Sequence, residues 1–218
     1  INAWSASPLI DYVRRPDPSF RFGVIDETQG EGHRVGILRM TSQNWLTPQE
    51  VDQTEWWHWM HIVIPENVEK STALLFIGGG SNRDTAPDPV DESMVQLAVA
   101  TRSVVASLSM VPNQPLKFHG AEEGLYEDAL IAYGWDQFLK HEDPRWLARL
   151  PMTKSAVRAM DTVVSYTAQA APNIPEIEDF VVAGGSKRGW TTWTTAIADP
   201  RVRAIAPIVI DMLNVVPS

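Results

Sequence analysis

The segment 180–190 limits what this chain can fold into more than any other part of it. It reads Phe-Val-Val-Ala-Gly-Gly-Ser-Lys-Arg-Gly-Trp. A short apolar run meets two glycines, a single serine and a further glycine, and a helical pattern follows. The pattern predicts a strand that turns sharply into a helix with Ser186 at the apex. Gly184 and Gly189 suit the places where the strand and helix backbones nearly touch.

This arrangement is similar to the nucleophile elbow of α/β-hydrolases, in which a tight turn presents a serine oxygen at the top of a sheet. The usual pattern is Gly-x-Ser-x-Gly. Here Arg188 occupies the place of the second glycine, and Gly189 follows one residue later. The interpretation therefore depends on the flanking strand and helix, and it makes Ser186 the candidate nucleophile.

Composition excludes several classes of function. The 218 residues are 44% hydrophobic, which predicts one globular domain over residues 1–218. A net charge of -9 argues against nucleic acid or an anionic membrane as the main partner. No apolar run approaches the about 20 residues that span a bilayer. The absence of cysteine excludes disulfides, thiolate metal sites and thiol catalysis. We expect neither a cofactor nor a metal.

Strand and helix patterns alternate along most of the chain. Because such alternation favours parallel strands, we expect an α/β fold with a mostly parallel sheet, helices on both faces and an apparent truncation after strand six. Residues 1–32 are predicted to form an irregular arm, because Pro8, Pro16 and Pro18 interrupt regular elements. Strands are expected at residues 34–41, 56–64, 73–77, 103–111, 177–183 and 203–210, and helices at 89–101, 127–140, 154–171 and directly after Ser186.

A serine nucleophile needs donors for the oxyanion that develops during acyl transfer. The backbone N–H after the nucleophile belongs to Lys187. A second N–H comes from the loop after strand three in this kind of fold, where Gly79 and Gly80 allow close approach to a substrate oxygen. The alternative for the glycine run at residues 78–80 is an ordinary flexible turn.

A serine nucleophile also needs a base, which is usually a histidine oriented by a carboxylate. Asp211 follows the last predicted strand and suits the carboxylate, although a helix N-cap or a buried structural role is the alternative. No histidine follows Ser186, whereas this fold orders the triad as serine, acid, histidine. Either a later segment supplies the histidine, which we prefer, or the site is not a standard triad. We expect the 218-residue chain alone to be weakly active or inactive.

Two groups of charged residues flank the elbow in the prediction. Lys187 and Arg188 either pair with an anionic group of a substrate, which makes Arg188 a candidate substrate-binding residue, or brace the elbow against nearby carboxylates. An acidic cluster is expected to be a solvated helix start, with a cation or substrate contact as the alternative. Its members are Glu122, Glu123, Glu127 and Asp128.

Histidine and tryptophan have structural explanations of their own. His58 and His61 cannot chelate one metal ion together, because strand residues three apart point to opposite faces, and packing is expected instead. The nine tryptophans indicate an aromatic core or, alternatively, a surface on which a sugar or peptide stacks.

Short segments along nearly the whole chain match the motifs of one family. They are residues 42–45, 57–59, 77–82, 111–116, 127–132, 150–154, 186–191 and 208–214. Together these segments resemble the PhoPQ-activated pathogenicity-related family. The family's proteins are longer, often exported and built on a presumed hydrolase core, which implies a secreted or periplasmic location. The elbow is also similar to that of glucuronoyl esterases, in which a basic residue follows the nucleophile.

Two functions remain open from the sequence. The first is a serine hydrolase that cleaves an ester or amide in a small-molecule, saccharide or peptide substrate. The second is a non-catalytic secreted protein that uses a hydrolase scaffold and a tryptophan-rich surface to bind a partner. The sequence carries no signal for an oligomeric state.

Overall fold

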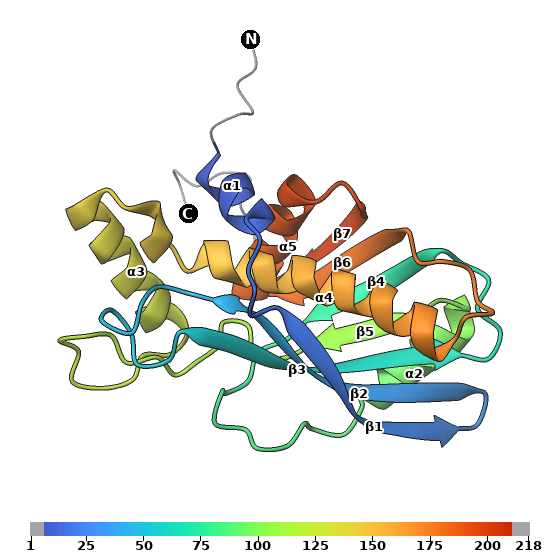
Figure 1. The fold of residues 1–218 in the computed structure, drawn as a ribbon. Helices are drawn as coiled ribbons and strands as arrows, with labels where there is room; N and C mark the ends of the chain where they lie inside the picture. The colour runs from blue at the N-terminus through green and yellow to red at the C-terminus, as the bar shows by residue number, and fades with distance from the viewer. Residues whose placement is uncertain (1–6, 211–218) are drawn as a thin grey trace, which may run out of the picture.

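A single seven-stranded sheet organises the molecule (Figure 1). The computed structural model describes residues 7–210. The strands follow the spatial order β1-β2-β3-β5-β4-β6-β7. Their bounds are β1 (Arg21–Gly30), β2 (His33–Asn44), β3 (Glu55–Pro65), β4 (Thr72–Ile77), β5 (Val105–Leu108), β6 (Asp179–Gly185) and β7 (Val202–Ile208). The helices are α1 (Pro8–Arg14), α2 (Glu92–Thr101), α3 (Glu127–His141), the short 3₁₀ helix η1 (Pro144–Trp146), α4 (Arg149–Ala170) and α5 (Lys187–Ala198).

The sheet is mixed, which corrects the expectation of a mostly parallel one. β4 pairs in parallel with β5 and β6, and β6 pairs in parallel with β7. β1–β2, β2–β3 and β3–β5 are antiparallel. The first three strands follow one another without intervening helices, and a short connection can join only antiparallel neighbours. The expected α/β class is confirmed, with helices on both faces of the sheet.

The N-terminal region is more regular than its prolines suggested, which corrects the prediction of an irregular arm. Pro8 begins α1, where a missing N–H costs nothing because the first turn has no intrahelical acceptor for it. Pro16 and Pro18 lie between α1 and β1. β1 was missed because nearly all its residues are exposed and therefore show no alternation between polar and apolar positions. This edge strand is the seventh, where six were expected.

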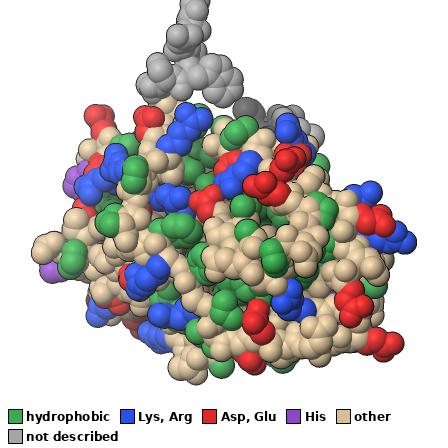
Figure 2. Space-filling model, turned by 45° about the vertical axis from the view of Figure 1, so that its right-hand side comes forward, with side chains coloured by type: hydrophobic (Ala, Val, Ile, Leu, Met, Phe, Trp, Pro, Cys, Tyr) green, Lys and Arg blue, Asp and Glu red, His purple; other side chains and the backbone are tan. Residues whose placement is uncertain are grey.

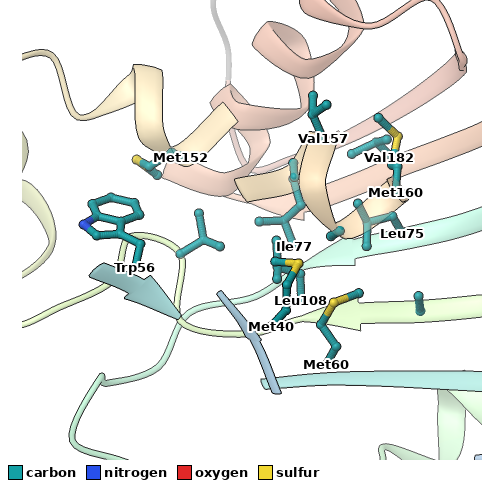
Figure 3. Packing of buried hydrophobic residues seen from close by; sticks show 14 of the residues in the cluster. Met40, Trp56, Met60, Leu75, Ile77, Leu108, Met152, Val157, Met160 and Val182 are labelled. Atoms are coloured by element: carbon teal, nitrogen blue, oxygen red, sulfur yellow. The ribbon is translucent and has the colours of Figure 1, made fainter. Parts of the chain in front are cut away.

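Two hydrophobic clusters lie on opposite faces of the sheet. The larger one packs α4 onto the central strands, and Figure 3 labels Met152, Val157 and Met160 of α4 together with Leu75 and Val182 of the strands among its residues. The smaller one packs α2 onto the other face and consists of Val35, Val63, Ala98 and Val105. Successive side chains of a strand point to opposite faces, so consecutive residues of β3 belong to different clusters.

Two element boundaries differ from the sequence prediction for physical reasons. α4 begins at Arg149, earlier than the expected residue 154, because Pro151 lies in its first turn, where proline is tolerated. β5 ends at Leu108, earlier than the expected residue 111. The chain then turns through Met110, whose φ of 65° is left-handed, and runs beside the loop that follows β4.

The surface carries charges of both signs. On the face shown in Figure 2, lysine and arginine side chains are interspersed with aspartate and glutamate. The net charge of -9 is therefore not gathered into one acidic patch on that face. Over residues 7–210, none of the helices has the length and apolar character that crossing a membrane requires.

Candidate active site

Ser186 occupies the turn between β6 and α5. Its side chain is exposed, and its backbone has φ 54° and ψ -120°, a conformation that residues with a side chain rarely adopt. Its N–H donates to the carbonyl of Ile208 at 2.8 Å, and its carbonyl accepts from the N–H of Trp190 at 3.1 Å. The predicted strand–turn–helix unit is therefore present, with the serine at the apex and its hydroxyl toward solvent.

Two glycines allow the turn to be this tight. A Cβ atom on Gly184 would lie 2.8 Å from the carbonyl oxygen of Arg188. A Cβ atom on Gly189 would lie 3.0 Å from the carbonyl oxygen of Gly184. Both contacts are with backbone atoms, which cannot move aside easily. The glycines thus bring the end of β6 against the first turn of α5.

Lys187 begins α5, and its amide is the donor expected to face an oxyanion. Within residues 7–210, this N–H has no backbone acceptor. The carbonyl of Lys187 accepts from Arg149 Nη1 at 2.7 Å, and its ammonium lies 3.1 Å from Glu127 Oε2 and 3.0 Å from Asp128 Oδ1. Partial burial lowers the pKa of Lys187, but the hydrogen bonds with Asp128 and Glu127 outweigh that effect and raise it.

The glycine run after β4 is held by the segment that follows β5. Met110 N–H donates to the carbonyl of Gly79 at 2.6 Å, and Val111 N–H donates to that of Gly78 at 3.1 Å. Gly79 and Gly80 are exposed, and the φ of 128° at Gly80 favours glycine. In the described part of the chain, the N–H groups of Gly79 and Gly80 have no backbone acceptor. The run is therefore not a loose turn, because two of its carbonyls are fixed.

Arg188 connects the elbow to this glycine run. A Cβ atom on Gly79 would lie 2.8 Å from Arg188 Nη2, so the two residues are in direct contact. The guanidinium donates from Nε to the carbonyl of Val111 at 2.5 Å and from Nη1 to Glu127 Oε2 at 3.0 Å. These are the contacts of the bracing alternative, and the substrate-binding role of Arg188 stays a prediction.

Glu127 is the site residue that sequence reasoning missed. The sequence places it in an acidic cluster that is expected to be solvated, and Glu122 and Glu123 of that cluster are exposed. Glu127 instead contacts both basic residues of the elbow. Its partner Arg188 is 61 positions away in the sequence, and local spacing cannot indicate an ion pair between residues so far apart.

The histidines of the chain take no part in the arrangement around Ser186. His58 and His61 are buried in β3, as expected from packing. His58 Nδ1 donates to the carbonyl of Ser109 at 3.0 Å, and Nε2 lies 3.0 Å from Ser42 Oγ. Ser186 Oγ has no hydrogen-bond partner among residues 7–210. Asp211 lies outside the described residues. The remaining histidines are His33, His119 and His141.

No metal cluster accompanies this arrangement: over the described part of the chain, no three histidine, aspartate or glutamate side chains are grouped so that they could hold an ion.

Tryptophans serve both the core and the surface. Trp45, Trp56, Trp59 and Trp146 are buried, which confirms an aromatic core. Trp135 on α3 and Trp193 on α5 are 44% and 40% exposed. Trp135 packs edge-on against Trp190, with ring centroids 6.0 Å apart. An aromatic surface therefore begins one helical turn after Ser186.

Solved structures similar to this one are esterases. Acetyl xylan esterase 1 from Thermoanaerobacterium sp. JW/SL YS485 aligns with a TM-score of 0.55 at 16% identity, over 91% of this chain and 55% of that one. An acetyl xylan esterase from Paenibacillus sp. R4 aligns with a TM-score of 0.54 at 12% identity, over 90% of this chain and 54% of that one. At such identities the similarity shows the fold alone, and the expected α/β-hydrolase-like fold is confirmed.

Sequence comparison identifies the family. Autocrine proliferation repressor protein A of Dictyostelium discoideum is 39% identical over 215 residues, which are 98% of this chain and 43% of that protein. The chain thus spans less than half the length of this relative. The family described as PhoPQ-activated pathogenicity-related protein matches residues 9–218. With that match and the relative's identity, the chain belongs to the PhoPQ-activated pathogenicity-related protein family.

Proposed function

We propose that this protein is a serine hydrolase that cleaves an ester or amide, with Ser186 as its nucleophile. The observation that carries the proposal is the conformation of Ser186, which is exposed and held at a positive φ on a turn that two close-packed glycines make possible. Strained backbone of this kind concentrates at functional sites. The hydrolase-like scaffold of the fold supports the same conclusion.

In this proposal Ser186 Oγ attacks the carbonyl carbon of the substrate while a histidine accepts the hydroxyl proton. The negative charge on the carbonyl oxygen is stabilised by the N–H of Lys187 and by that of Gly79 or Gly80. The histidine passes the proton to the departing alcohol or amine, and water then hydrolyses the acyl-enzyme. Asp211 would orient that histidine, which in this proposal is none of the five histidines that precede Ser186 in this sequence.

A fluorophosphonate probe tests the nucleophile directly, because it reacts covalently with activated serines. The protein expressed from its full coding sequence should be labelled, and Ser186→Ala should abolish labelling. Ser93→Ala, which changes an exposed serine of α2, is the matched control and should leave labelling intact. Labelling that persists in Ser186→Ala would sink the proposal.

A specific observation also favours a second function, that of a secreted signalling protein. The relative from Dictyostelium discoideum is named as an autocrine proliferation repressor, which supports a location outside the cell. The exposed aromatic surface of Trp135 and Trp193 offers a place for a partner. If this function is correct, Ser186→Ala retains repression in a proliferation assay, whereas Trp135→Ala and Trp193→Ala weaken it. Loss of repression in Ser186→Ala alone would favour the hydrolase.

A further inference from the structure

Glu127 joins three segments that are distant in the sequence. Its carboxylate receives two hydrogen bonds from the guanidinium of Arg188, one of them 3.0 Å long from Nη1 to Oε2. The ammonium of Lys187 lies 3.1 Å from Oε2. Gln114, in the segment after β5, donates from Nε2 to Oε1 at 2.7 Å. One carboxylate therefore contacts both basic residues of the elbow and the loop beside the glycine run.

The backbone of Glu127 is held as firmly as its side chain. Its φ is 47°, in the left-handed region, which costs a residue with a side chain on the order of 1 kcal/mol. Its N–H donates to Gln114 Oε1 at 2.8 Å, so the side-chain amide of Gln114 hydrogen-bonds both the backbone and the carboxylate of Glu127. A strained conformation persists only where its surroundings over-determine it. The position of this carboxylate is therefore specified, unlike that of an ordinary surface glutamate.

The carboxylate is ionised throughout the physiological range. Partial burial by itself raises the pKa of Glu127, but the hydrogen bonds from Arg188 and Gln114 outweigh it and lower the pKa to about 2. The neighbouring Glu123 is a useful contrast, because it is exposed and forms no ion pair within residues 7–210. Solvated glutamates of that kind contribute little to a fixed geometry.

Arg188 connects Glu127 to the proposed oxyanion donors through direct contact with the glycine run. Its guanidinium lies against Gly79, and its Nε donates to the carbonyl of Val111 at 2.5 Å. Val111 in turn donates its own N–H to Gly78. The guanidinium is thus enclosed by the glycine run, the segment after β5 and Glu127, while its own backbone follows Lys187 directly.

We propose that Glu127 is a positioning residue of the Ser186 site: it holds Arg188 against Gly79 and so sets the spacing between the N–H of Lys187 and the N–H groups of the glycine run. This inference rests on the proposed hydrolase function for its catalytic meaning. Oxyanion donors must lie about 2.7–3.1 Å from a single oxygen. A displacement of about 1 Å can lower a rate on the order of 100-fold.

The test compares Glu127→Gln with Glu123→Gln in the protein expressed from its full coding sequence. Glu127→Gln keeps the shape of the side chain and removes its charge. We expect the maximal rate of fluorophosphonate labelling to fall by about 10- to 100-fold, with the apparent affinity for the probe unchanged. Glu123→Gln should label like the wild type. Glu127→Asp retains the charge, and we expect it to label faster than Glu127→Gln.

Hydrogen–deuterium exchange provides a second readout that does not require activity. Peptides that cover residues 78–82 and 186–190 should exchange faster in Glu127→Gln than in Glu123→Gln, while peptides from α2 should not change. If the wild type is not labelled but these peptides exchange faster, the hydrolase function fails and the positioning claim stands. Wild-type labelling kinetics together with unchanged exchange in Glu127→Gln would overturn the positioning claim.

Discussion

The guanidinium of Arg188 lies directly on the backbone of Gly79. A Cβ atom at Gly79 would stand 2.8 Å from Nη2 and 3.2 Å from Cζ of Arg188. Separations below 3.0 Å require one of the two groups to move. The glycine therefore provides room for a charged side chain from the elbow, and the two segments fit together only when residue 79 lacks a side chain.

Gly79→Ala should displace the tip of Arg188 and disturb the proposed oxyanion donors. We expect the rate of fluorophosphonate labelling to fall by about 10-fold. The free energy of unfolding should fall by about 1 kcal/mol, because the displaced guanidinium loses hydrogen bonding with Val111 and Glu127. Gly23→Ala is the control, since its new Cβ atom has no neighbour within 4 Å. Equal labelling by the two variants would contradict the prediction.

Ser186→Gly should be more stable than Ser186→Ala. Glycine adopts the φ of 54° at this position without the penalty that a Cβ atom brings. After allowance for the greater freedom of glycine in the unfolded chain, we expect a difference of about 1 kcal/mol in the free energy of unfolding, measured with urea. At Ser93, inside α2, the order should reverse, because glycine weakens a helix. The same order at both positions would argue against strain at Ser186.

His58 should make stability depend on pH. Burial lowers the pKa of His58 from 6.5 to about 4, against the opposing effect of its hydrogen bond to the backbone at Ser109. Between pH 6.5 and pH 4 the unfolded chain takes up a proton that the folded chain does not, so the folded state loses stability as the pH falls. We expect a loss of roughly 3 kcal/mol from this group.

Urea unfolding at a series of pH values measures that loss. His58→Gln should remove this part of the pH dependence, although it also destabilises the protein at neutral pH. His119→Gln, at an exposed position, should leave the wild-type pH dependence in place. An identical dependence in His58→Gln and the wild type would show that the effect has another source.

Arg201→Ala should cost more stability than Arg203→Ala. Arg201 Nη2 lies 2.7 Å from Asp199 Oδ2 and 2.8 Å from Asp161 Oδ1, which ties the start of β7 to α4. Removing it leaves the partly buried Asp199 without its cation and Asp161 with Arg158 alone, which we expect to cost about 2 kcal/mol. The pair of Arg203 with Asp179 is more exposed, and its loss should cost less than about 1 kcal/mol. Thermal unfolding of both variants checks the order.

The local part of the site was predictable from sequence because its determinants are adjacent. Gly184, Ser186 and Gly189 lie within one turn, and their spacing alone predicts the strand, the bend and the helix. The strand β3 was equally visible, since its run of aromatic and β-branched residues is long. In both places, neighbours along the chain are also neighbours in space.

The missed features depend on partners that are remote in sequence. β1 is an edge strand whose exposed side chains carry no periodic signal, and it forms because β2 lies beside it. In the sequence, Glu127 cannot be distinguished from any other acidic residue at a helix start, because its partner Arg188 lies 61 positions away. Without that partner, its residue type and local spacing favoured solvent over an ion pair.

The side-chain amide of Gln114 hydrogen-bonds both the carboxylate and the backbone N–H of Glu127. This limits how the sequence of such a protein can change during evolution. A substitution at Glu127 removes a partner from both Gln114 and Arg188, and a substitution at either of those two removes a partner from Glu127. A single change is therefore expected to be selected against. Substitutions at these three positions should therefore be inherited together across homologues. An engineer who transplants this turn into another scaffold should move all three residues as one unit.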